Sequence, residues 1–164
     1  GNQIGKSIRE ENCEKIIDEI FKTAKKFSCK IIFPDDVLVG KHMNDKATIK
    51  ETKSIKNDDL ILDIGPKTLI KKKKIIEVSK TVLWNGPAGY FENPNFANGS
   101  IEIANTIARM NKSKSIYSVV GGGDTVALVN QIKAIKSFNF VSTAGGAFLE
   151  FLEGKELPGI KALN

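Results

Sequence analysis

The segment that decides the fold is Ser118-Val119-Val120-Gly121-Gly122-Gly123-Asp124-Thr125. In this segment an apolar stretch runs into three consecutive glycines, and an acid and a hydroxyl residue then open a second apolar stretch. Consecutive glycines are used where the backbone turns tightly or where a bulky group approaches its N–H groups. If a helix begins at Asp124, its free N–H groups and its dipole favour a bound anion such as phosphate. The alternative is a tight strand-to-helix turn without a ligand.

The composition is that of an ordinary globular protein. With 164 residues, of which 41% are hydrophobic and 27% charged, the chain can form one domain with a sizeable core. Apolar runs such as Ile31–Phe33 are too short to span a membrane, and Gly1–Lys6 lacks the apolar part of a signal peptide. Cys13 and Cys29 form neither a disulfide framework nor a metal-binding spacing, so we expect reduced thiols and a cytoplasmic protein. Because the first residue is not Met, we expect a piece of a longer protein.

The net charge of +6 comes mostly from lysine, since Arg9 and Arg109 are the only arginines. Proteins that read nucleic acids favour arginine forks and stacked aromatic rings, and neither is clustered in this sequence. The run Lys71–Lys74 lies between apolar residues, which favours the solvated face of a helix over a nucleic-acid surface. The lysine excess suits a protein that handles anionic metabolites.

Hydrophobic periodicity and helix-breaking residues predict alternating strands and helices. We expect helices over Arg9–Phe27, Pro66–Ser79, Ile101–Asn111, Val126–Ile135 and Ala147–Leu152. We expect strands over Lys30–Phe33, Val37–Val39, Leu60–Leu62, Thr81–Trp84, Ser115–Val120 and Phe138–Val141. The polar segment Gly40–Asn57 is expected to be an excursion or a hairpin, and Leu157–Gly159 an irregular tail. Apolar strands without alternation predict an α/β fold: a Rossmann-like three-layer αβα domain with a mainly parallel sheet.

Motifs of glycine and polar residues follow four of the predicted strands. They are Asp63-Ile64-Gly65-Pro66, Asn85-Gly86-Pro87, Gly121–Thr125 and Ser142–Gly146. Ligands of open parallel sheets bind beyond the carboxyl ends of the strands, so these motifs together predict an anion-binding crevice.

Other classes of site are disfavoured by missing motifs. The sequence has no G-x-x-x-x-G-K-[ST], so the predicted crevice is not a Walker P-loop. No G-x-G-x-x-G opens a first βαβ unit, which disfavours a nicotinamide dehydrogenase. It has no G-x-S-x-G elbow with a usable histidine, which disfavours a hydrolase triad. The only histidine, His42, lies in a polar segment without a second metal ligand and is expected at the surface.

Asp124 has two possible and compatible roles. Aspartate is a preferred N-cap, so its carboxylate can satisfy amides at the start of the following helix. It can also hold Mg²⁺ through one carboxylate while phosphates supply the other oxygens.

Several motifs follow one another along essentially the whole chain. They are Pro34–Val37, Asp63–Pro66, Trp84–Pro87, Phe91-Glu92, Gly121–Thr125, Ser142-Thr143, Gly145–Ala147, Leu149-Glu150 and Leu152–Gly159. Together and in this order, these motifs resemble those of phosphoglycerate kinases. The resemblance implies reversible phosphoryl transfer between 1,3-bisphosphoglycerate and ADP in glycolysis, with Mg²⁺. It covers only the later part of the C-terminal, nucleotide-binding domain, so we expect residues 1–164 to form an incomplete domain. The N-terminal domain that binds phosphoglycerate is missing, as are the family's Gly-Gly-Ala-Lys-Val segment with its phosphate lysine and a glycine-rich segment at the adenine.

The resemblance also implies which residues bind the nucleotide and the metal. By matching motif, these are Asn85, Gly86, Pro87, Glu92, Gly121, Gly122, Gly123, Asp124 and Thr125. Glu92 is expected to accept hydrogen bonds from the ribose hydroxyls, and Asp124 to hold the metal. The remaining partners are ADP or ATP and, through the missing domain, phosphoglycerate; we expect neither nucleic acid nor membrane as partners, and a monomer.

For the phosphoryl group itself, the resemblance implies mainly backbone contacts. Gly122 and Gly123 are expected to touch the transferring phosphate, with help from Thr125. The catalytic set is Gly123 together with Gly145 and Gly146, whose N–H groups lie along the phosphoryl path. Alignment, amides and a metal carry such a transfer, so no histidine base or cysteine nucleophile is needed.

Two residues depart from the family pattern. Ala144 stands where the family has the first of three glycines, and it is strained by about 1 kcal/mol or more if its φ is positive. Phe148 replaces a small polar residue on the last predicted helix.

Three hypotheses follow for function. The chain is a fragment of a phosphotransferase that has a carboxyl group as acceptor, or, taken alone, a non-catalytic module that binds nucleotide weakly or supports a core. We favour inactivity for the isolated chain, because the acid-binding domain and the phosphate lysine are absent. The third hypothesis is a dinucleotide-dependent oxidoreductase.

Overall fold

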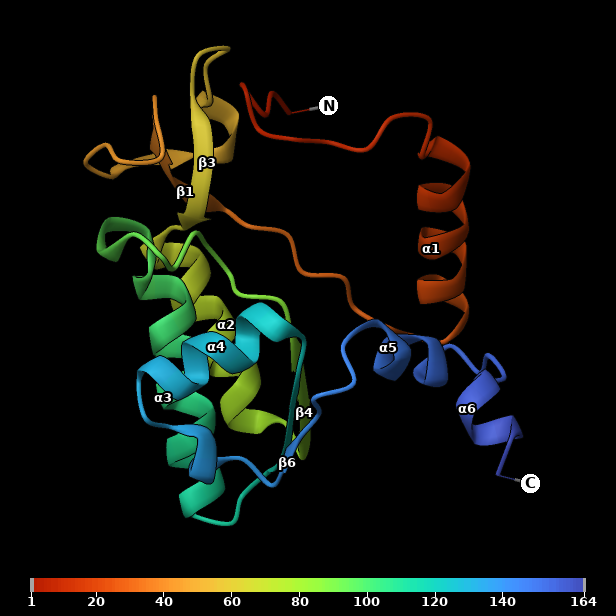
Figure 1. Ribbon diagram of the computed structural model, residues 1–164. Coiled ribbons are helices and arrows are strands. Elements are labelled where there is room, and N and C mark those ends of the chain that lie inside the picture. The colour runs from red at the N-terminus through yellow and green to blue at the C-terminus, as the bar shows by residue number, and fades with distance from the viewer. Residues whose placement is uncertain (1, 164) are drawn as a thin grey trace.

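The computed structural model describes residues 2–163, in which strands and α-helices alternate from β3 to α5 (Figure 1). The α-helices are α1 (Glu14–Lys26), α2 (Pro66–Val78), α3 (Asn98–Lys112), α4 (Gly123–Gln131), α5 (Gly146–Leu152) and α6 (Pro158–Lys161). The strands are β1 (Asp36–Gly40), β2 (Thr48–Glu51), β3 (Leu60–Ile64), β4 (Thr81–Asn85), β5 (Tyr117–Gly121) and β6 (Phe140–Val141). Short 3₁₀ helices lie at Thr52–Ser54, Pro94–Phe96 and Ile135–Ser137. The α/β class predicted from the sequence is confirmed.

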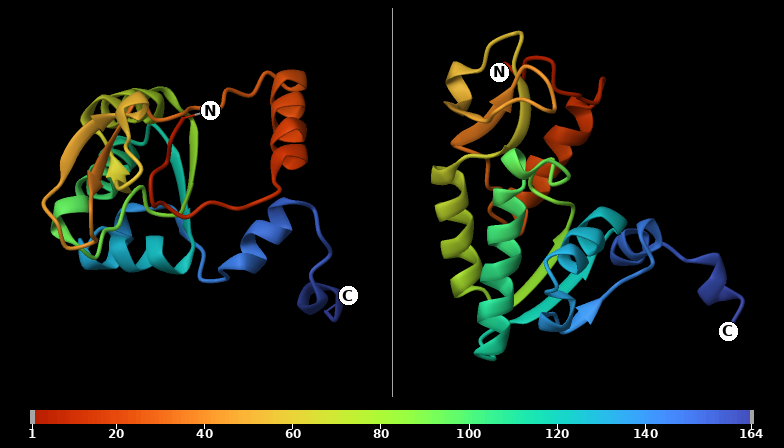
Figure 2. Two further views of the ribbon diagram at one scale, coloured as in Figure 1. Left: turned by 90° about the horizontal axis from the view of Figure 1, so that it is seen from above. Right: turned by 60° about the vertical axis from the view of Figure 1, so that its left-hand side comes forward.

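A parallel sheet of order β4-β5-β6 carries the main core. Trp84 and Val120 are paired in this sheet and pack with Ile107 of α3 and Leu128 of α4. Helices α2, α3 and α4 supply the residues of this core, and α2 and α3 run side by side (Figure 2). On one face of this sheet the side chains are apolar because they contact α2, α3 and α4.

The opposite face of the parallel sheet is open in the described part of the chain. Its side chains Leu83, Tyr117 and Phe140 are 44%, 52% and 51% exposed. The sequence predicts helices on both faces, whereas within residues 2–163 the packed helices cover one.

A second sheet is antiparallel, with order β2-β1-β3 and an irregular register between Leu38 and Val39. The expected mainly parallel arrangement therefore holds for β4–β6 only. Of the two alternatives for Gly40–Asn57, an excursion or a hairpin, the structure supports the hairpin, in which β2 from this segment pairs with the preceding strand β1.

Buried carboxylates join this antiparallel sheet to the helices. Asp36 of β1 accepts the amides of Lys67 (3.0 Å) and Thr68 (2.8 Å) in the first turn of α2. Burial raises the pKa of Asp36, but the hydrogen bonds from Thr68 and Lys67 outweigh it and leave the pKa below its ordinary value of 3.8. Asp63 of β3 accepts the amide of Gly99 at the start of α3 (2.8 Å). Both carboxylates therefore act as N-caps supplied by another part of the chain.

Two elements differ from the sequence-based predictions. Lys30–Phe33 forms no strand within the described chain, and Phe33 is 57% exposed. Its backbone has no neighbouring strand there with which to form a ladder. The predicted irregular tail is wrong in part, because Pro158 opens the short helix α6 with a proline at its first position.

Helix α1 stands apart from both sheets (Figure 1 and the left view of Figure 2). It begins at Glu14 rather than at Arg9, and none of its residues is buried. Ile16, Ile20 and Phe21 are 58%, 52% and 47% exposed on it. The apolar stripe that predicted a packed amphipathic helix is therefore present without a covering partner among residues 2–163. No helix in that range has the length and apolar character to cross a membrane.

Candidate functional site

The glycine turn after β5 has the geometry of an open helix N-terminus. Strand β5 ends at Gly121, Gly122 has φ 84° and ψ 135°, and α4 begins at Gly123. The first backbone bond at this end runs from the Val126 amide to the Gly122 carbonyl at 3.0 Å. Within residues 2–163, the preceding amides of Gly123, Asp124 and Thr125 donate to no protein acceptor. These amides and the helix dipole form a site suited to an anion.

The N-cap of α4 decides between the two roles open for Asp124. The cap residue is Gly122, and no side chain makes a capping hydrogen bond. Asp124 lies inside the first turn, and its side chain is exposed. Its role as an N-cap is therefore excluded, which leaves its carboxylate free to bind a cation.

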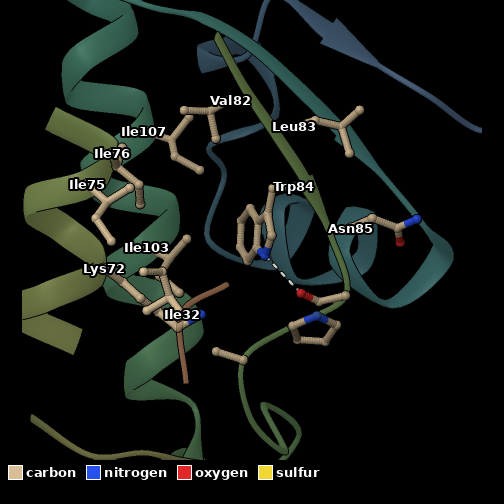
Figure 3. A pocket seen from close by; sticks show the side chains of 13 residues that line it. Ile32, Lys72, Ile75, Ile76, Val82, Leu83, Trp84, Asn85, Ile103 and Ile107 are labelled. Atoms are coloured by element: carbon tan, nitrogen blue, oxygen red, sulfur yellow. Dashed lines mark hydrogen bonds between the residues drawn. The ribbon is translucent and has the colours of Figure 1, made fainter. Parts of the chain in front are cut away.

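Strand β4 ends beside this turn, because Asn85 pairs with Gly121 in the parallel ladder. A Cβ atom on Gly122 would overlap the Asn85 Oδ1 atom, so glycine is required at this point by close approach as well as by its positive φ. Asn85 and Leu83 point to the opposite side of β4 from Val82 and Trp84 (Figure 3). Asn85 therefore lies on the open face of the sheet, next to the glycine turn.

The Asn85-Gly86-Pro87 turn is held by side chains on both sides of Gly86. The Trp84 Nε1 atom donates to the Gly86 carbonyl at 2.8 Å, and the Gly86 amide donates to Thr125 Oγ1 at 2.7 Å. Thr125 is fully buried. The sequence predicts Thr125 as a phosphate contact and does not predict its bond to Gly86.

A cavity of about 380 Å³ lies on the other side of β4 (Figure 3). Its lining is mostly apolar, with Ile75, Ile103 and Trp84 on its walls and Lys72 at its edge. It reaches Asn85–Ala88 but not the glycine turn. This cavity is therefore distinct from the predicted phosphate position.

The residues present fit a magnesium ion shared with phosphates. No group of three or more His, Cys, Asp or Glu side chains within residues 2–163 could hold a metal by itself. Mg²⁺ in nucleotide sites is commonly held by one or two carboxylates plus phosphate oxygens, and Asp124 is an exposed carboxylate beside the free amides of α4. Glu92 is exposed in the turn closed by the bond from the Asn93 amide to the Tyr90 carbonyl.

The last glycine motif precedes α5. Gly145 has φ 54° and ψ −125° and is the N-cap of that helix, and a Cβ atom at Gly145 or Gly146 would meet no other atom within 4 Å. Ala144 is not among the residues with positive φ, so the strain considered for it is absent. Phe148 lies against the end of β5, since a Cβ atom on Gly121 would be 3.0 Å from its Cδ1 atom.

Of the four motifs predicted to line the crevice, Asp63–Pro66 does not lie at the edge of the parallel sheet. Asp63 is buried, with 2% of its surface exposed, and its carboxylate accepts the amides of Ile64 and Gly99. Burial raises the pKa of Asp63 above its ordinary value, although these hydrogen bonds oppose the shift. Gly65 lies against the Asp36 carboxylate, where a Cβ atom would overlap it. Asp63–Pro66 therefore lies at the end of a strand of the antiparallel sheet, where it takes part in capping helices. The prediction that it lines the anion-binding crevice is wrong.

Comparisons with known proteins show which proteins this chain is similar to. The family model for phosphoglycerate kinase matches residues 1–155. Among curated relatives, the phosphoglycerate kinase of Zymomonas mobilis is 44% identical over 166 residues, which is 100% of this chain and 42% of the relative. That of Wolbachia pipientis from Culex pipiens is 42% identical over 161 residues, or 97% of this chain and 41% of the relative.

Solved structures give the same result. The phosphoglycerate kinase of Coxiella burnetii matches with a TM-score of 0.90 and 38% identity, covering 100% of this chain and 42% of that protein. The Pyrococcus horikoshii kinase matches with a TM-score of 0.69 and 28% identity, covering 98% and 40%. The chain thus spans about two fifths of the length of its relatives. It belongs to the phosphoglycerate kinase family.

Proposed function

We propose that residues 1–164 are the later part of the C-terminal, nucleotide-binding domain of a phosphoglycerate kinase. The parent enzyme moves a phosphoryl group between 1,3-bisphosphoglycerate and ADP, giving 3-phosphoglycerate and ATP. The observation that carries the proposal is the uncapped start of α4, whose free amides lie beside the end of β4 at one edge of a parallel sheet. Such an edge is where α/β folds bind nucleotides.

In this proposal the backbone binds the phosphates. The amides of Gly122 and Gly123 donate to phosphate oxygens, and the positive end of the α4 dipole stabilises their charge. The backbone of Gly121 lines the same position. Gly145 and Gly146 offer further amides, with Gly123, along the path of the phosphoryl group.

Side chains hold the rest of the nucleotide and the cation. Asn85, Gly86 and Pro87 line the nucleotide at the end of β4, and Glu92 accepts from the ribose hydroxyls. Asp124 would hold Mg²⁺, which when bound neutralises charge on the phosphates. Phosphoryl transfer depends on positioning and electrostatics, so the protein need not supply a nucleophile that forms a covalent intermediate.

For the isolated chain we propose nucleotide binding without turnover. The chain spans about two fifths of its relatives, so more than half of a kinase lies outside it. The binding site for phosphoglycerate and the phosphate lysine would come from that part. We propose a cytoplasmic location for the enzyme.

The first prediction concerns Asp124. Binding of ADP to the chain, measured by calorimetry with and without Mg²⁺, should be tighter with Mg²⁺. In Asp124→Asn, the increase in ADP affinity caused by Mg²⁺ should be smaller by a factor of about ten or more, because a charged ligand to the cation is lost. NADH should not compete.

Asp18→Asn is a matched control, since Asp18 is an exposed carboxylate on α1. It should bind Mg-ADP as the parent chain does. Equal magnesium dependence in Asp124→Asn would remove Asp124 from the metal site, and preferential binding of NADH would overturn the proposed function in favour of an oxidoreductase.

A further inference from the structure

Gly86 is the point at which β4 is tied to α4. Its amide donates to Thr125 Oγ1 (2.7 Å) and its carbonyl accepts from Trp84 Nε1 (2.8 Å), so both backbone polar groups are held by side chains (Figure 3 shows the second bond). Gly86 has φ 92°, and this conformation takes it out of the strand ladder. Without these two side chains, the residue has no regular partner to fix it.

Both side chains are themselves rigidly held. Thr125 is fully buried and Trp84 is 8% exposed, and Trp84 belongs to the main core. The bond to Thr125 joins residues 39 apart in the sequence. It connects the Asn85-Gly86-Pro87 turn directly to the first turn of α4, which carries the free amides and Asp124.

We propose that Thr125 and Trp84 are positioning residues, whose side chains fix the Asn85-Gly86-Pro87 turn relative to the glycine turn without themselves touching the phosphates. This inference rests on the proposed nucleotide site. A ligand that spans both turns binds best when the two turns are already held at the separation found in the complex. No conformational entropy is then lost in ordering them on binding. A ligand that contacts only the α4 amides does not.

The two classes of ligand give the test. Thr125→Val keeps the shape of the side chain but removes the acceptor for the Gly86 amide, and Trp84→Phe removes the donor to the Gly86 carbonyl. Each should weaken ADP binding by about three- to tenfold, the range expected for one hydrogen bond, and leave pyrophosphate binding unchanged. Thr125→Ser should restore ADP binding. Thr106→Val is a matched control, since Thr106 is 2% exposed and its hydroxyl donates to Glu102 within α3 at 2.7 Å.

Amide exchange of Gly86 provides a readout that does not depend on nucleotide. The amide should be protected in the parent chain and exchange faster in Thr125→Val, but not in Thr106→Val. Equal losses of ADP and pyrophosphate affinity in Thr125→Val would overturn the proposal in favour of direct phosphate contact. An unprotected Gly86 amide in the parent chain would overturn it as well. If the amide is protected but neither the parent chain nor any variant binds ADP, the proposed function fails and the positioning role fails with it.

Discussion

Gly122 carries the backbone conformation on which the candidate site depends. Its φ of 84° is unfavourable for any residue with a Cβ atom, and a Cβ atom would also overlap Asn85 Oδ1. We expect Gly122→Ala to lower the free energy of unfolding by about 1–3 kcal/mol. Urea denaturation followed by the fluorescence of Trp84, the single tryptophan, measures this change.

Gly123→Ala is the control for that substitution. Gly123 is the first residue of α4, and a Cβ atom there would meet nothing within 4 Å. It should leave the free energy of unfolding unchanged or raise it slightly, since alanine is the better helix former. Equal losses in the two variants would show that neither the positive φ nor the approach of Asn85 explains Gly122.

At the scale of elements, Asp59 holds together the turn between β2 and β3. Its carboxylate accepts from Lys41 Nζ (2.8 Å), Lys50 Nζ (2.6 Å) and the Lys56 amide (2.7 Å), and its side chain is 1% exposed. The Lys41 ammonium, then Lys50 and the Lys56 amide, hold the pKa of Asp59 well below its ordinary value.

The sign of the resulting pH dependence follows from this depressed pKa. The stabilisation is fully present above about pH 4, near the unfolded-state pKa, and is lost as the pH falls toward the folded-state pKa. We expect the free energy of unfolding to decrease between about pH 4 and pH 2. In Asp59→Asn this decrease should be smaller, and stability at pH 7 should fall by about 1.5–3 kcal/mol, the range for a charged hydrogen bond. Denaturant titrations at several pH values would contradict this if both proteins lost stability in parallel.

Helix α5 depends on one aromatic contact. None of its residues is fully buried, but Phe148 is half-buried and lies close to Gly121 at the end of β5. We expect Phe148→Ser to speed amide exchange throughout Gly146–Leu152 while β5 stays protected, because little else holds this short helix. Phe151→Ser, at a position 58% exposed on the same helix, should have no such effect. Unchanged exchange in Phe148→Ser would show that α5 is held by other contacts.

At the scale of the whole molecule, two apolar surfaces lack a partner among residues 2–163. One is the open sheet face with Leu83, Tyr117 and Phe140, and the other is the apolar stripe of α1 with Ile16 and Ile20. Exposed apolar patches promote association. We therefore expect the 164-residue chain alone to self-associate as its concentration rises, which sedimentation velocity measures; the monomer stays a prediction for the complete kinase.

Charged substitutions on the open face test this expectation. Leu83→Lys combined with Phe140→Lys should shift the chain toward monomer. Val78→Lys is the control: Val78, the last residue of α2, is 81% exposed and lies outside the open face. This substitution should leave the self-association unchanged. A parent chain that stays monomeric at every concentration would contradict the prediction.

The sequence was most informative where structure is local. Periodicity and breakers predicted α2 and β4 nearly to the residue, and the three glycines predicted the turn between β5 and α4. It failed at Lys30–Phe33, whose apolar composition is that of a strand, because a strand exists only when a neighbour supplies its hydrogen bonds.

What the sequence by itself determined was the family, the α/β class and the glycine turn, since these rest on motifs and on the conformational freedom of adjacent residues. Only the tertiary structure decided what the polar side chains do. Asp63 caps a helix 36 residues away, and Thr125 accepts a hydrogen bond from Gly86, 39 residues away. Aspartate and threonine can bind a ligand or satisfy a backbone amide with the same atoms. Which of these occurs depends on which group the fold brings within about 3 Å, and no spacing along the chain specifies that distance.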